Sequence, residues 1–152
     1  MPDGTEVIDR VLRDQLLLAV THVVGLGSLF HVGEWAPRKK LVRNPNLAPK
    51  LQAFQGSRSL YVQCDWTLDA PLDLVAEGSF PATALDRMTL LDHLVDRRVV
   101  SVDLALPSLT IHVQDGFALE LHLDRGTCSM SDGGNDWKVT ADGVGEVQGS
   151  ER

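Results

Sequence analysis

Residues 60–68 read LYVQCDWTL, and this stretch is the strongest indicator of the fold. Apolar side chains occupy every second position, from Leu60 to Leu68, and the positions between them hold Tyr61, Gln63, Asp65 and Thr67. Because successive side chains of a strand point to opposite faces, this alternation is typical of a β-strand with one buried face. We therefore expect Cys64 and Trp66 to face the core.

The last third of the chain is predicted to be a C-terminal β-meander. Its strands are expected over residues 99–104, 109–114, 118–124 and 137–140. Asp115-Gly116 marks the middle hairpin, and we place the loop at residues 115–117 because this register pairs Ile111 with Leu121. A two-residue loop would put a carboxylate beside a core isoleucine.

Two amphipathic helices complete the predicted architecture. The first starts at residue 5 and is indicated by apolar residues spaced three and four apart, namely Val7, Ile8, Val11, Leu12 and Leu16. The second runs from about residue 84 to 95, with Thr83 as its N-cap. The expected class is α+β: an antiparallel sheet with two helices packed on one face. We expect a single domain over residues 1–141 and a flexible tail over 142–152.

The most apolar stretch, residues 16–32, is interpreted as a buried helix or strand because it is too short and too polar to span a membrane. Its two histidines, His22 and His31, are interpreted as hydrogen-bonded core residues. The acidic N-terminus lacks the features of a secretory signal, so we expect a cytoplasmic location, no membrane contact, and reduced thiols at Cys64 and Cys128.

Charge is unevenly distributed along the chain. Residues 38–58 contain six basic residues and no acid, and since the whole chain carries −7, the rest of it carries −13. The candidate binding residues in this segment are Arg38, Lys39, Lys40 and Arg43. They are suited to contacting phosphates, but a negatively charged protein repels nucleic acid, so we do not expect a nucleic-acid partner. The alternative is a solvated loop docked on the acidic body.

One polar cluster follows from the predicted hairpin register. His112 would face Glu120 directly, and His122 would lie diagonal to His112 on the same sheet face. Two imidazoles and a carboxylate are suitable ligands for zinc or iron, or groups for acid–base catalysis. The alternative is that these residues simply form the solvent-facing side of an antiparallel sheet. Ser28 lies outside any nucleophile-elbow motif, and we expect no cofactor.

The strand at residues 60–66, the segment 99–104, the hairpin around Asp115-Gly116 and the pair Asp136-Trp137 together resemble a family of uncharacterised actinobacterial proteins. The similarity extends over most of the chain. That family carries no established activity, so the resemblance implies a fold and leaves the function open.

The sequence favours an interaction protein over an enzyme, because strong acidity is combined with the lack of any recognisable catalytic motif. Our leading hypothesis is that an acidic surface binds another macromolecule, most reasonably another protein, in an immunity-protein-like or accessory role. The alternative hypothesis is a small enzyme or a ligand- or metal-binding protein that uses His112, Glu120 and His122. The oligomeric state is left open.

Overall fold

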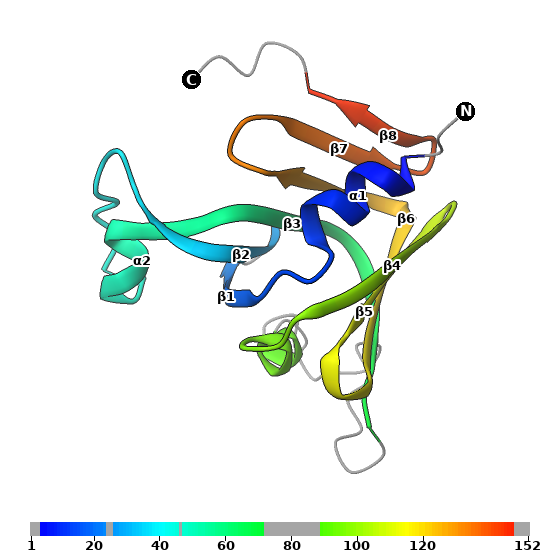
Figure 1. Ribbon diagram of the computed structural model, residues 1–152, viewed down its shortest axis with the longest axis horizontal. Helices are drawn as coiled ribbons and strands as arrows, with labels where there is room; N and C mark the ends of the chain where they lie inside the picture. Colours follow the sequence, from blue (N-terminus) through cyan, green and yellow to red (C-terminus); the bar gives the residue numbers. More distant parts are fainter. Residues whose placement is uncertain (1–3, 24–25, 46, 72–88, 148–152) are drawn as a thin grey trace.

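The computed structural model describes residues 4–23, 26–45, 47–71 and 89–147. Within these residues, eight strands form one antiparallel sheet and the helical elements are short (Figure 1). In chain order the elements are α1 (Thr5–Leu12), β1 (Leu17–Val23), β2 (Gly27–Pro37), α2 (Pro49–Ala53), β3 (Phe54–Asp69), the 3-10 helix η2 (Leu90–Leu94), β4 (Val99–Ala105), β5 (Ser108–Val113), the 3-10 turn η3 (Gln114–Gly116), β6 (Phe117–Ser131), β7 (Asp136–Thr140) and β8 (Gly143–Glu146).

Six of the strands form a barrel in the order β1-β2-β3-β6-β5-β4. The two ends of this path meet, because the backbone N–H of Leu17 donates to the carbonyl of Arg97 at 2.9 Å. A bridge between Leu16 and Arg98 lies beside this hydrogen bond. The sheet thus closes on itself at this end, and β7 and β8 extend it from the last part of β6.

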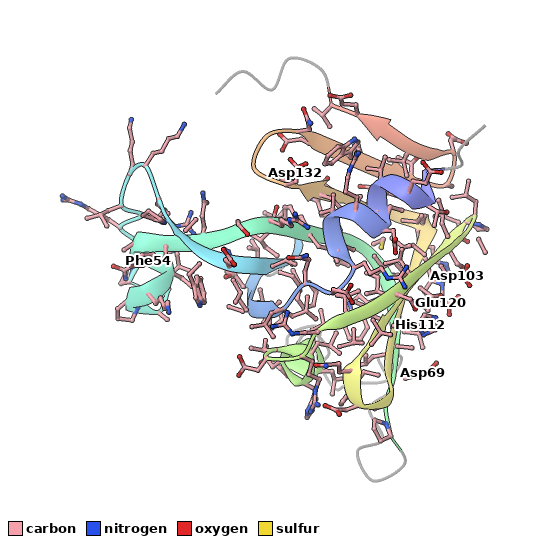
Figure 2. The ribbon with its side chains drawn as sticks, viewed as in Figure 1. Phe54, Asp69, Asp103, His112, Glu120 and Asp132 are labelled. Carbon is pink, nitrogen blue, oxygen red and sulfur yellow. The ribbon has the colours of Figure 1, made fainter. Side chains whose placement is uncertain are left out.

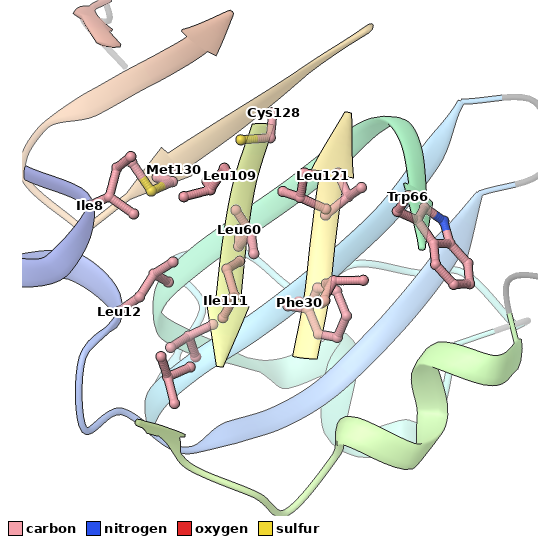
Figure 3. Close-up of a cluster of buried hydrophobic side chains, with 14 of the residues drawn as sticks. Ile8, Leu12, Phe30, Leu60, Trp66, Leu109, Ile111, Leu121, Cys128 and Met130 are labelled. Atoms are coloured by element: carbon pink, nitrogen blue, oxygen red, sulfur yellow. The ribbon is translucent and has the colours of Figure 1, made fainter. Parts of the chain in front are cut away.

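The core lies inside the barrel and beneath α1 (Figure 3). On β3 the predicted alternation is confirmed, except that Cys64 is only half-buried. The start of the first helix is also confirmed, and its apolar side adds three residues that are closed to solvent: Ile8, Val11 and Leu12. Spacings of three and four residues place these side chains on one helical face, which explains why the pattern was readable.

Strand β6 changes its neighbour along its length. Its first part lies between β3 and β5, and its last part lies between β3 and β7. Along β3 the register jumps from Asp65 opposite His122 to Cys64 opposite Gly126, so β6 has three extra residues at this point. Gly126 has a φ of +127°, and a Cβ placed there would lie 2.3 Å from the carbonyl oxygen of Gln63. Glycine is therefore the residue that fits this bulge.

The predicted α+β class, with two helices packed on one face of the sheet, is wrong, because the fold is β-rich. Within the apolar stretch 16–32, residues 17–23 and 27–32 belong to strands β1 and β2, where the apolar pattern alone had left helix and strand open. Of the second predicted helix the described residues contain η2, while residues 84–88 lie outside them. Strand β8 occupies part of the expected tail, and β6 continues through the turn-like residues Asp124-Arg125-Gly126, where we expected its end.

The middle hairpin has a different register from the predicted one. Its loop is η3, so Val113 pairs with Phe117, and Ile111 pairs with Leu119 rather than with Leu121. Asp115 and Gly116 adopt positive φ values of 68° and 87°, which allows the chain to turn one residue earlier. Phe117 can then enter the strand and bury its ring, and this burial favours the observed register.

The β6 bulge generates a prediction about two glycines. Gly126→Ala should lower the free energy of unfolding by more than about 2 kcal/mol, because the new Cβ meets the backbone of β3 and the positive φ is strained. Gly145→Ala is the matched control, since a Cβ there meets nothing within 4 Å, and it should change stability by less than about 0.5 kcal/mol. Urea unfolding measures both, and equal losses would contradict the role of the bulge.

Candidate functional site

The strand registers place the predicted residues His112, Glu120 and His122 on one outer face of the sheet. Figure 2 labels two of them, His112 and Glu120. The cross-strand partners of these residues differ from the predicted ones, however. His112 is opposite Ala118, Glu120 is opposite Thr110, and His122 is opposite Ser108. The expected direct pairing of His112 with Glu120 is wrong, because the loop begins one residue earlier and shifts the register by two.

His122 is engaged in a local hydrogen bond. Its Nε2 lies 2.9 Å from Oγ1 of Thr67, on the neighbouring strand β3. Across the described residues, no three His, Cys, Asp or Glu side chains are grouped in the way that metal ligands are. The described geometry therefore gives the metal hypothesis no support.

The same face is rich in carboxylates, which are positioned by three adjoining cross-strand rows. One row contains Asp103, Thr110, Glu120 and Thr67, and its neighbours contribute Asp65 and Asp69. We define the acidic sheet face as the side of these rows that carries Asp65, Thr67, Asp69, Ser101, Asp103, Ser108, Thr110, His112, Glu120 and His122. These described positions contain neither lysine nor arginine, although Arg125 approaches Asp65 at 3.8 Å from the adjoining bulge. Figure 2 shows labelled members of this face along one side of the molecule.

The basic segment forms a separate lobe, built from the end of β2, the loop after it, α2 and the start of β3 (Figure 1). Inside the lobe, Nε of Arg38 donates to the carbonyl of Leu51 at 2.8 Å, and Nζ of Lys50 lies 4.6 Å from the centre of the Trp35 ring. Lys39, Lys40 and Arg43 are exposed.

The contacts of Arg38 and Lys50 stay inside the lobe, whereas those of Arg58 reach beyond it. Nη1 of Arg58 donates to the carbonyls of Arg10 and Val11, at 2.9 and 3.1 Å, and so caps the end of α1. Its positive charge also helps to lower the pKa of Asp132 in the turn after β6. The docking of the whole segment on the acidic body stays a prediction.

His31 is a buried, hydrogen-bonded histidine, as predicted, although it projects from the outer side of β2. Trp35 stacks on its ring with a centroid distance of 6.2 Å, and its Nδ1 accepts a hydrogen bond from the N–H of Gly56 at 3.2 Å. Burial, assisted by the positive charge of Arg38, lowers the pKa of His31 to about 4. The imidazole is therefore neutral at pH 7, with its proton on Nε2.

His22 belongs to a hydrogen-bonded trio that sequence reasoning missed. Its Nδ1 lies 2.9 Å from Oγ of Ser28, and its Nε2 lies 2.9 Å from Oδ1 of Asp92. These are the residue types of a catalytic triad, but Ser28 is only 2% exposed, so its hydroxyl is closed to substrate. The trio joins η2 to the first hairpin. No sequence spacing signals it, because Asp92 is 70 residues from His22.

Neither Cys64 nor Cys128 forms a disulfide in the structure. Cys128 is buried, and burial, with a smaller contribution from Cys64, raises the pKa of its thiol to about 12. Cys64 is half-buried, although we expected it to be largely covered. Neither thiol is placed in the electropositive, accessible setting that activates a nucleophilic cysteine.

Comparison with known proteins leaves the chain without an assigned family: no family model, no curated protein and no solved structure matches it. The resemblance noted from the sequence therefore stays a prediction. In the described residues, none of the helices combines the length and the apolar character that crossing a membrane requires.

The burial of His31 predicts acid sensitivity. In the unfolded chain its pKa has the ordinary value of 6.5, whereas in the folded protein it is about 4. Between these values the unfolded chain binds the proton first, so the free energy of unfolding falls as the pH drops below about 6.5, and this loss levels off below about pH 4. His31→Asn keeps an acceptor near Gly56 but cannot titrate. Urea titrations at pH 7 and pH 4 measure how much the free energy of unfolding falls between these pH values. This fall should be about 3 kcal/mol smaller in the His31→Asn variant than in the wild type. Equal falls in the two proteins would contradict this assignment.

The two thiols should differ in reactivity. With a thiol-reactive dye under native conditions, Cys64 should be labelled before Cys128, because it is more exposed and the pKa of Cys128 is raised. Labelling of the Cys64→Ser variant isolates Cys128, which should react at the rate of global unfolding. Rapid labelling of that variant in native buffer would show that the barrel interior is open at this point.

Proposed function

We propose that this protein binds a basic partner protein through the acidic sheet face, in an accessory or immunity-type role. The observation that carries the proposal is the placement of Asp65, Asp69, Asp103 and Glu120 on adjoining rows without a lysine or arginine among the described residues of those rows. Complementary charge increases the rate of association and disfavours partners of the wrong sign.

The sheet gives these carboxylates a fixed spacing. Asp103 and Glu120 lie in one row with Thr110 of β5 between them, which separates their backbones by about 10 Å. Serine and threonine hydroxyls fill the positions between the charges and can donate or accept hydrogen bonds. A partner with two basic side chains at a similar spacing would match this row without any rearrangement of the sheet.

The enzymatic alternative has less support. Ser28 is hydrogen-bonded to His22, which in turn contacts Asp92, but Ser28 is buried. The described residues also contain no group of side chains arranged as metal ligands. By contrast, the acidic sheet face is accessible: Asp69, Asp103 and His112 are all exposed. We therefore favour a surface that recognises a partner over a pocket that transforms a substrate.

The test is affinity purification from cells of the source organism, using the full chain and two charge-matched variants. The first variant, Asp103→Asn with Glu120→Gln, removes two charges from the acidic sheet face. The second, Glu34→Gln with Glu146→Gln, removes two exposed charges from elsewhere. Melting temperatures show whether both variants remain folded.

The expected result is a basic protein that, once purified, binds the wild type and the second variant equally and binds the first at least about tenfold more weakly. This difference should shrink in high salt, because exposed charges are screened. Equal weakening by both variants, retention of full affinity by the first variant, or recovery of only neutral and acidic proteins would overturn the proposal.

A further inference from the structure

A polar groove of about 690 Å³ lies on the outer side of β2, β3, β6 and β7, away from the acidic sheet face. Its floor contains one cross-strand row: His31 pairs with Ser59, Ser59 with Ser131, and Ser131 with Asp136. One wall is the basic lobe, marked by Phe54 in Figure 2, and the other is the turn between β6 and β7, marked by Asp132. Its volume is within the range of small-molecule sites.

His31 supplies a hydrogen-bond donor that no described residue uses. The side chain lines the groove although it is only 3% exposed. Because Nδ1 accepts the N–H of Gly56, the proton of the neutral ring is on Nε2. No described residue accepts a hydrogen bond from this Nε2, so the donor is available to a ligand or to water in the groove.

Two hydroxyl groups continue the row of donors. Ser131 accepts the N–H of Gly133 at 3.2 Å, which leaves its hydroxyl hydrogen free to donate. Ser59 stands between His31 and Ser131, and its hydroxyl has no hydrogen-bond partner among the described residues. Adjacent strands are about 4.8 Å apart, so the three donors span a distance that a tetrahedral oxyanion and its ester oxygen can bridge.

Positively charged side chains line the same groove as this row. Arg38 and Lys39 line the groove, and the guanidinium of Arg38 is positioned by Leu51 and by the side-chain oxygen of Gln55 at 3.2 Å. Two acidic residues lie nearby: Asp132 is hydrogen-bonded within its own turn, and Asp136 lies at the far end of the row. Asp132 accepts the N–H groups of Gly134 and Asn135, at 2.9 and 2.8 Å, and Asp136 ends the row on β7.

The pKa of Asp132 agrees with this arrangement. Burial acts to raise it, but the hydrogen bonds from Asn135 and Gly134 and the charge of Arg58 outweigh burial and hold the pKa below its usual value. Asp132 thus stays ionised within the turn that it stabilises. Its oxygen Oδ1 is already occupied by the backbone donors of Gly134 and Asn135, two residues of the turn beside the groove.

We propose that this groove binds the phosphate group of a small phosphorylated molecule, with Nε2 of His31 and the hydroxyls of Ser59 and Ser131 as donors and with Arg38 and Lys39 as counter-charges. A dianionic, tetrahedral group uses several donors and two cations better than a planar carboxylate does. A long polyanion fits less well, because the chain as a whole carries −7. This site is independent of the acidic sheet face.

Two neighbouring lysines provide a matched test. Lys39 lines the groove, whereas Lys40, the next residue, is equally basic and exposed but does not line it. Full-length wild type, Lys39→Ala, Lys40→Ala and the double variant Ser59→Ala with Ser131→Ala would be titrated by calorimetry at about 150 mM salt. The probes are inorganic phosphate, ribose 5-phosphate, succinate and a single-stranded oligonucleotide. Thermal unfolding checks that each variant is folded.

We expect saturable binding of ribose 5-phosphate with a Kd below about 1 mM, binding of inorganic phosphate more weakly, and weaker binding of succinate than of either. Lys39→Ala and the double serine variant should each weaken binding at least about fivefold, while Lys40→Ala should stay within about twofold of the wild type.

Four outcomes would overturn the proposal. Saturable binding of neither phosphate probe would remove the site, and succinate binding as tight as phosphate binding would remove the preference for phosphate. Equal losses in Lys39→Ala and Lys40→Ala would indicate diffuse attraction to the lobe. Tighter binding of the oligonucleotide than of ribose 5-phosphate, weakened equally by both lysine changes, would replace the groove by a nucleic-acid surface.

Discussion

The pairing of β3 with β6 is the constraint on which the rest of the structure depends. It runs from Ser59 to Asp69 along β3 and contains the bulge at which β6 leaves β5 and joins β7. On one side of the bulge the outward residues belong to the acidic sheet face, and on the other side they belong to the floor of the groove. One pair of strands therefore sets the spacing of both candidate sites, and Gly126 allows the two halves to meet.

The two surfaces separate the charges of the chain in space. The carboxylates of the acidic sheet face stand on strands of the barrel, where hydrogen-bonded registers hold them. Arg38, Lys39, Lys40, Arg43 and Lys50 lie on the lobe, where contacts such as the stacking of Lys50 on Trp35 are local, whereas Arg58 reaches the end of α1. Since opposite charges near each other would cancel much of the field at either site, this separation preserves an attractive potential at both.

Local patterns in the sequence predicted the parts of the fold that depend on local geometry. The alternation from Leu60 to Leu68 and the helical spacing of Ile8 and Leu12 were readable because side-chain direction repeats with a known period. The predicted faces of His112, Glu120 and His122 were also right, since a register error of two residues preserves the side of the strand.

Features that depend on distant contacts were not readable. Barrel closure joins Leu16 to Arg98, and the groove collects His31, Ser59, Ser131 and Asp136 from four strands. Neither arrangement leaves a spacing in the sequence that distinguishes it from an ordinary polar strand. The basic segment was visible as a run of charge, but the difference between Lys39 and Lys40 depends on how the lobe turns against β6 and β7.

Strand β8 determines how the sheet ends. Among the residues that the structure describes it pairs only with β7; it is four residues long, contains two glycines and carries Glu146, so its outer edge is a poor template for another chain. Long, flat and apolar edges invite strand addition and aggregation, whereas short edges with a charge resist both. Growth into fibres by continuing the sheet is thus disfavoured at this border, and contacts with other molecules are directed to side chains on the faces.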